Sequence, residues 1–98
     1  MSNRSEPGIE EVAESLERWR ERTANLRLLS KPAEESSQRE YARTLHLMED
    51  LLQRIQQMLS RADAMTPEEW VDARTQMLAA LQTLQVHYNN AVADWPQR

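Results

Sequence analysis

An apolar repeat in the middle of the chain constrains the fold most, because its spacing alternates between four and three residues without exception. The repeat consists of Tyr41, Leu45, Met48, Leu52, Ile55, Leu59 and Ala62. Such steps return to one side of an α-helix, which turns once in about 3.6 residues, whereas a strand needs steps of two. The repeat therefore predicts one long amphipathic helix over residues 33–62.

A second apolar row runs beside the first and widens the hydrophobic face of this helix. Its members are Leu47, Leu51, Met58 and Met65. At about 100° per residue the two rows span an arc of roughly 160°, which is more than one neighbouring helix covers. We expect this helix to lie at the centre of the molecule and to contact two others.

The start of a following helix is specified by the sequence Met65-Thr66-Pro67-Glu68-Glu69-Trp70. Thr66 is expected as the N-cap, Pro67 as the first helical residue, and Glu69 as the partner that completes a capping box. Met65 can then pack on Trp70. The short link between Ala62 and Thr66 leaves room only for a tight reversal, so this helix, over residues 67–94, should run antiparallel to the central one.

A narrower stripe precedes the central helix and predicts a third one over residues 8–29. It consists of Ile9, Val12, Leu16, Trp19, Thr23 and Leu26. Leu28 and Leu29 fall off the stripe, so the helix is expected to end there. Ser30 is expected to cap the central helix, with Pro32 in its first turn.

These patterns together predict an all-α antiparallel three-helix bundle, with residues 1–98 as one domain and residues 1–6 as a disordered tail. The chain has 98 residues, 40% of them hydrophobic and 29% charged, a balance typical of soluble domains. It holds no cysteine and no apolar leader, so we expect a cytoplasmic protein. Eleven of its twelve cationic residues are arginine, which favours a bacterial source.

The sequence from Thr75 to Ala93 contains no charged residue, in a chain where almost one residue in three is charged. Interface centres are depleted of charge, so this stretch is a candidate docking surface for another protein. The alternative is a solvated face that is neutral by chance. The candidate partner-binding residues are Leu78, Gln82, Gln85, Asn89, Val92, Trp95 and Trp19.

Trp19 and Trp95 enter that set because large aromatic side chains anchor many interfaces. Trp95 ends its helix, and Trp19 belongs to the narrowest stripe. The helix predicted over residues 67–94 has its own apolar stripe, which consists of Trp70, Ala73, Met77, Leu81, Leu84, Tyr88, Ala91 and Trp95. Trp70 and Tyr88 lie within this stripe, where they are expected to fill the core.

Catalytic, metal and cofactor sites are not predicted. No phosphate-binding loop, nucleophile elbow or paired inward carboxylates appear in the sequence. His46, Glu49 and Asp50 could converge on one side of a helix, but the surface alternative is favoured. A net charge of −4 argues against nucleic acid as a partner, and no apolar run is long enough for a membrane span.

Three functions remain open. The first is a non-enzymatic interaction module, an adaptor, chaperone or regulatory subunit; in size, acidity and helical content the chain resembles the small chaperones of bacterial flagellar and type III secretion export. The second is an inhibitor or immunity protein that occludes an enzyme, suggested by the acidic residues from Glu6 to Glu21. The third is a homo-oligomeric coiled coil, suggested by the repeat of residues 33–62, and a homodimer would stabilise so small a core.

Overall fold

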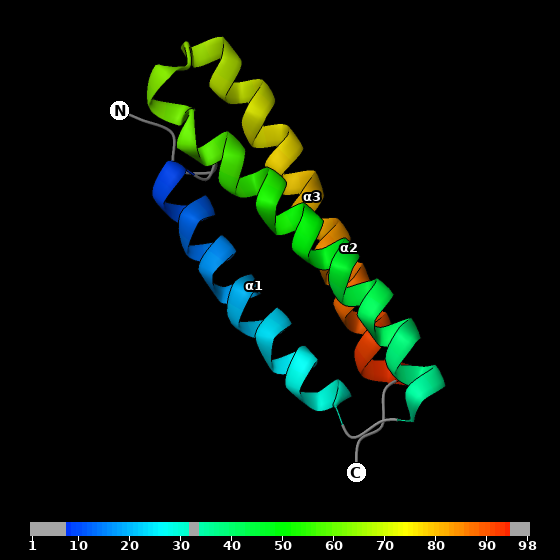
Figure 1. Cartoon of the computed structure of the whole chain (residues 1–98). Helices are drawn as coiled ribbons and strands as arrows, with labels where there is room; N and C mark the ends of the chain where they lie inside the picture. Colours follow the sequence, from blue (N-terminus) through cyan, green and yellow to red (C-terminus); the bar gives the residue numbers. More distant parts are fainter. Residues whose placement is uncertain (1–7, 32–33, 95–98) are drawn as a thin grey trace.

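The computed structural model describes residues 8–31 and 34–94, and it confirms the predicted helical bundle (Figure 1). Within these residues the elements are helix α1 (Ile9–Ser30), helix α2 (Glu35–Ser60), a short 3₁₀-helix η1 (Ala62–Ala64) and helix α3 (Pro67–Asp94). They form a rod with principal extents of 52 × 21 × 16 Å. The predicted tail, residues 1–6, lies outside the described residues.

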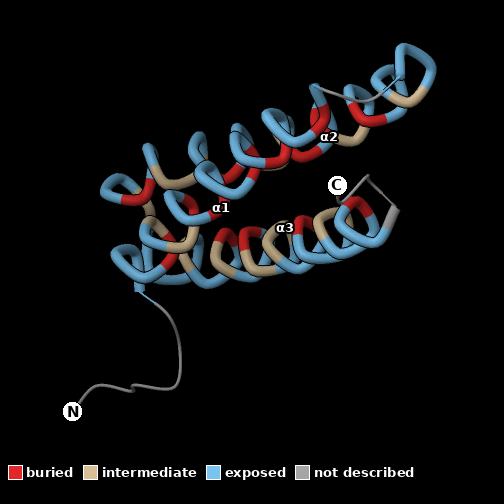
Figure 2. The backbone as a smooth tube through the Cα atoms, turned by 90° about the horizontal axis from the view of Figure 1, so that it is seen from below, coloured by how far each residue is buried: buried red, intermediate tan, exposed pale blue. Residues whose placement is uncertain are grey.

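Helix α2 lies between the other two and runs antiparallel to both (Figures 1 and 2). Helices α1 and α3 each pack along α2, whereas α1 and α3 contact each other far less. The central position expected from the wide apolar face is therefore confirmed. A single helix could not cover both rows of that face, so α2 needs a neighbour on each side.

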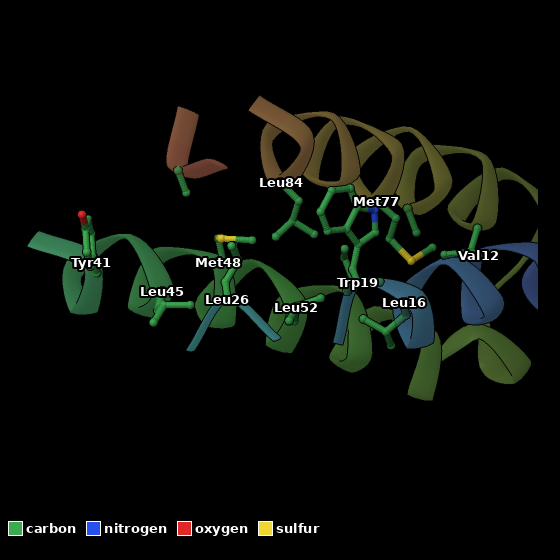
Figure 3. Close-up of a cluster of buried hydrophobic side chains, with 13 residues drawn as sticks. Val12, Leu16, Trp19, Leu26, Tyr41, Leu45, Met48, Leu52, Met77 and Leu84 are labelled. Atoms are coloured by element: carbon green, nitrogen blue, oxygen red, sulfur yellow. The ribbon is translucent and has the colours of Figure 1, made fainter. Parts of the chain in front are cut away.

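The core is one continuous cluster between the inner faces of the three helices (Figures 2 and 3). Met48 and Ile55 of α2 and Met77 and Leu84 of α3 are 0% exposed. Helix α1 contributes the side chains that its stripe predicted, which are Val12, Leu16, Trp19, Thr23 and Leu26. Ile9, the first member of that stripe, is instead 41% exposed. It occupies the first position of α1, at the end of the stripe.

The second apolar row of α2 is only partly covered. Leu51, Met58 and Met65 are half-buried against the core, but Leu47 is 45% exposed. Leu59 of the first row is also only half-buried, because α2 ends at the next residue. Ala62, the last member of that row, is buried in η1 and not in α2.

The expectation that Ser30 caps the central helix is wrong. Ser30 is the last residue of α1, and its hydroxyl donates a hydrogen bond back to the carbonyl of Arg27 at 2.8 Å. The N-cap of α2 is Glu34, in extended conformation, and α2 begins at Glu35. The expected end of the first helix is confirmed to within one residue, since α1 ends one residue after Leu29; Leu28 and Leu29 are 61% and 57% exposed. Pro32 lies outside the described residues.

The predicted start of α3 is confirmed in both hydrogen bonds of the capping box. The Glu69 amide donates to Thr66 Oγ1 at 3.1 Å, and the Thr66 amide donates to Glu69 Oε1 at 3.0 Å. Together with η1, this cap reverses the chain between α2 and α3. Met65 and Trp70 on either side of it are half-buried against the core.

Replacing the fully buried Ile55 by alanine should lower the free energy of unfolding by about 2–4 kcal/mol, since it opens a cavity in the core. Leu47→Ala in the same helix is the matched control, and it should change the free energy by less than about 1 kcal/mol because Leu47 faces solvent. Urea denaturation followed by circular dichroism measures both values. Equal losses would contradict the observed orientation of α2.

Removing the cap with Thr66→Ala should lower the free energy of unfolding by about 1 kcal/mol, because the Glu69 amide loses its acceptor. The control is Thr83→Ala in the same helix, where the hydroxyl binds the carbonyl of Ala79 at 3.1 Å. Alanine favours the interior of a helix, so this change should be neutral or slightly stabilising. A Thr66→Ala protein as stable as the Thr83→Ala protein would show that the capping box contributes nothing.

Candidate functional site

The uncharged stretch Thr75 to Ala93 occupies the last two thirds of α3 and divides between two sides of that helix. On the inner side, Met77, Leu84 and Ala91 are buried in the core. On the opposite side, polar residues of the stretch are exposed, among them Gln76, Gln82, Thr83, Gln85, Asn89 and Asn90. The lack of charge thus extends from the core to the solvent-exposed side of α3.

One exposed sector of α3 combines these amides with apolar side chains, and we name it the outer face. It consists of Val71, Thr75, Leu78, Gln82, Gln85, Val86, Asn89 and Val92. At about 100° per residue these eight positions fall within an arc of roughly 120°. Val71, Val86 and Val92 are 46%, 56% and 38% exposed, and Leu78 is half-buried. The outer face therefore presents apolar surface, and from Thr75 to Val92 it carries no formal charge; Arg74, which has the same direction as Val92 on the helix, borders it beside Val71.

Five of the seven predicted partner-binding residues lie on the outer face, which are Leu78, Gln82, Gln85, Asn89 and Val92. Trp95 lies outside the described residues. The prediction did not include Val71, Thr75 and Val86. The sequence does place Val71 on the same side of the helix as Leu78, because the two are seven residues apart. The exposure of Val86, in contrast, follows only from the way the inner side of α3 packs.

Polar groups of the outer face are already partly satisfied within α3. Gln85 Nε2 donates to Asn89 Oδ1 at 2.9 Å, and Thr75 Oγ1 donates to the carbonyl of Val71 at 3.0 Å. Burying Thr75 under a partner would therefore leave no hydroxyl without an acceptor. The amides retain further donors and acceptors for a second chain.

Trp19 does not belong to this surface, because its side chain is only 6% exposed and lies in the core (Figure 3). Its ring meets the Tyr88 ring of α3 edge to face, with centroids 5.5 Å apart at an interplanar angle of 79°. Arg22 Cζ lies 4.8 Å from the centroid of the Trp19 ring and 5.7 Å from the centroid of the Tyr88 ring. Trp19 and Tyr88 therefore join α1 to α3, and Trp19 cannot anchor a partner unless α1 moves away.

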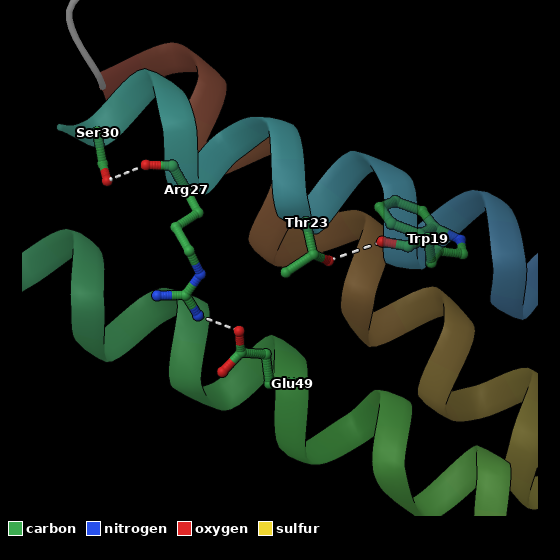
Figure 4. A network of polar contacts seen from close by, with 5 residues as sticks. All are labelled: Trp19, Thr23, Arg27, Ser30 and Glu49. Atoms are coloured by element: carbon green, nitrogen blue, oxygen red, sulfur yellow. Dashed lines mark hydrogen bonds and ion pairs between the residues drawn. The ribbon is translucent and has the colours of Figure 1, made fainter.

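Polar contacts between α1 and α2 lie elsewhere on the molecule (Figure 4). Arg27 forms an ion pair with Glu49, and Arg20 Nη2 donates to Gln56 Oε1 at 2.9 Å. The buried hydroxyl of Thr23 donates to the carbonyl of Trp19 at 2.7 Å. The contacts of Arg27 and Arg20 fix the register of α1 on α2 and engage Glu49 and Gln56, whereas the Thr23 bond lies within α1.

The residues considered as metal ligands do not form a cluster. His46 and Asp50 are exposed, and within residues 8–31 and 34–94 no group of three or more histidine, aspartate and glutamate side chains is positioned to hold a metal ion.

Comparison with protein-family models, with curated proteins and with solved structures returned no match to this chain. In the part of the chain that the structure describes, none of the helices has the length and hydropathy needed to cross a membrane.

Trp19→Ala should lower the free energy of unfolding by about 3–5 kcal/mol, because it empties the space between α1 and α3. Arg22→Ala removes only the exposed cation above the same rings and should lower it by no more than about 1 kcal/mol. Thermal and urea denaturation of both variants measures the difference. A Trp19→Ala protein as stable as the wild type would contradict its place in the core.

Proposed function

We propose that this protein is a non-enzymatic protein-interaction module that binds its partner through the outer face of α3. One observation carries the proposal: the outer face is exposed and apolar in part, and from Thr75 onward it lacks formal charge in a chain of which 29% is charged. A solvated helix face has little physical reason to avoid charge, whereas a binding face does.

Burial under a partner explains the composition of the outer face. Removing a charged side chain from water is expensive unless an opposite charge pairs with it, whereas an amide needs only a hydrogen bond. Covering Val71, Val86 and Val92 releases apolar surface from water, worth about 25 cal/mol per Å². The amides of Gln82, Gln85 and Asn89 can then form directional hydrogen bonds with the partner.

The exposed side of α1 supports this choice by contrast. Glu10, Glu14 and Glu17 share it with Arg18 and Arg20, and Arg20 Nε lies 4.0 Å from Glu17 Oε2. Interspersed opposite charges are typical of a helix face that stays in water. The outer face of α3 differs from this side of α1 in its depletion of charged residues, which is typical of the centres of protein interfaces.

The test is affinity capture from the native host with the wild-type chain and with a Gln82→Glu/Gln85→Glu variant. Two carboxylates at the centre of the outer face should weaken partner capture at least about tenfold, because each must be desolvated without a counter-ion. Both positions are exposed, so helicity and the melting temperature should stay close to those of the wild type.

The matched control is Gln53→Glu/Gln57→Glu, which adds the same two charges to exposed positions of α2. This control should capture the partner as well as the wild type does. Equal capture by all three proteins would refute the outer face as the binding site. Loss of folding in the Gln82→Glu/Gln85→Glu variant would show that this face belongs to the core.

A further inference from the structure

The outer face contains a second regular repeat, separate from the one that forms the core. Its members alternate at steps of four and three residues, in the order Val71, Thr75, Leu78, Gln82, Gln85, Asn89 and Val92. This is the spacing by which one helix packs along another in a coiled coil. The inner repeat of α3 is occupied by α1 and α2, but the outer repeat faces solvent. The outer side of α3 thus has the spacing of a helix-packing face in addition to the inner side that the core uses.

We propose that a second copy of this chain occupies the outer face, with the two α3 helices antiparallel about a twofold axis at Gln82. This inference rests on the proposed function, because it names the partner of the same face. The supporting observations are the charge of the chain, the hydrogen-bonding chemistry of the face and the symmetry of its spacing.

Charge favours a second copy over a different partner. The chain has a net charge of −4, so two copies repel each other in general. In a twofold interface the same patch occurs on both sides, and an acidic patch would face its own acids. A face without charge brings no like charges into contact and so adds nothing to this repulsion. A different partner would not require it, since that partner could supply the opposite charges and be steered by them.

The amides of the outer face are complementary to themselves. A glutamine or asparagine side chain both donates and accepts hydrogen bonds, so it can pair with an identical side chain. Lysine and arginine only donate, and ionised carboxylates only accept. Gln82 on the twofold axis would meet Gln82 of the second copy, and each amide could donate one hydrogen bond to the other and accept one from it.

The spacing of the repeat is nearly symmetric about Gln82. In the antiparallel arrangement Val71 lies opposite Val92 of the second copy, Thr75 opposite Asn89, and Leu78 opposite Gln85. We call the line of contact between the two α3 helices the seam. Apolar pairs therefore lie at both ends of the seam, and the amides lie in its middle. A parallel arrangement would instead place the acidic first turns of α3, which carry Glu68 and Glu69, beside each other and would align the two helix dipoles unfavourably.

The seam is short, which sets the expected strength of the dimer. From Val71 to Val92 it covers about 32 Å at about 1.5 Å per residue. One helix pair of this length buries less than the roughly 1,200–2,000 Å² of a standard stable interface. The dimer should therefore dissociate on dilution.

Sedimentation velocity of the full chain over about a hundredfold range of concentration tests the proposal. The sedimentation coefficient of the wild type should rise from the monomer value toward the dimer value. Gln82→Glu should shift this transition to at least about tenfold higher concentration, since two like charges then meet on the axis. Gln53→Glu, the control, should leave it unchanged.

Oxidative crosslinking, at a concentration at which the wild type is dimeric by sedimentation, provides a second measurement, which reports which positions lie at the contact. The natural chain holds no cysteine, so Gln82→Cys introduces a single thiol on the proposed axis. It should form a disulfide-linked dimer at least about tenfold faster than Gln53→Cys, because the two thiols are held within bonding distance.

The outcomes separate this inference from the proposed function. A wild type that stays monomeric throughout, or Gln82→Cys that crosslinks no faster than Gln53→Cys, overturns the second copy as the occupant. If carboxylates at Gln82 and Gln85 then still abolish capture of a different protein, the outer face remains the binding site. If they change neither association nor capture, both proposals are wrong.

Discussion

The burial of the wide apolar face of α2 is the interaction on which the rest of the structure depends. Met48 and Ile55 are 0% exposed because α1 covers one side of this face and α3 the other. Apolar area removed from water is the main favourable contribution in so small a domain. Neither flanking helix contacts the other as extensively as it contacts α2, so both depend on the central helix for their place.

The contact between α1 and α3 depends on few side chains. Trp19 and Tyr88 meet edge to face, with Arg22 above both rings, and this group brings together helices that are otherwise only loosely in contact. Along α2, α1 is positioned instead by Arg27 with Glu49 and Arg20 with Gln56. Exposed polar pairs of this kind contribute register more than stability, so the apolar stripe holds α1 in place.

The regular repeat of α2 suggested a homo-oligomeric coiled coil, but the bundle itself uses that repeat. Tyr41, Leu45 and Leu52 are buried by the chain's own helices, so this repeat needs no second chain to explain it. The uncovered repeat lies on α3, where valines and amides face solvent without charge. The proposed binding surface and its proposed symmetric occupant therefore both rest on α3, the helix that carries two apolar sectors of different composition.

The sequence by itself determined the three helices, the central place of α2 and the start of α3, since helical periodicity and the Thr66–Glu69 capping box are local properties. It also located most of the outer face, because a gap in charge is visible without coordinates. Only the tertiary structure decided that Trp19 is core, that Ser30 ends α1 and that Val86 is exposed. A periodic pattern defines which residues share a side of a helix, whereas burial depends on which neighbours cover that side.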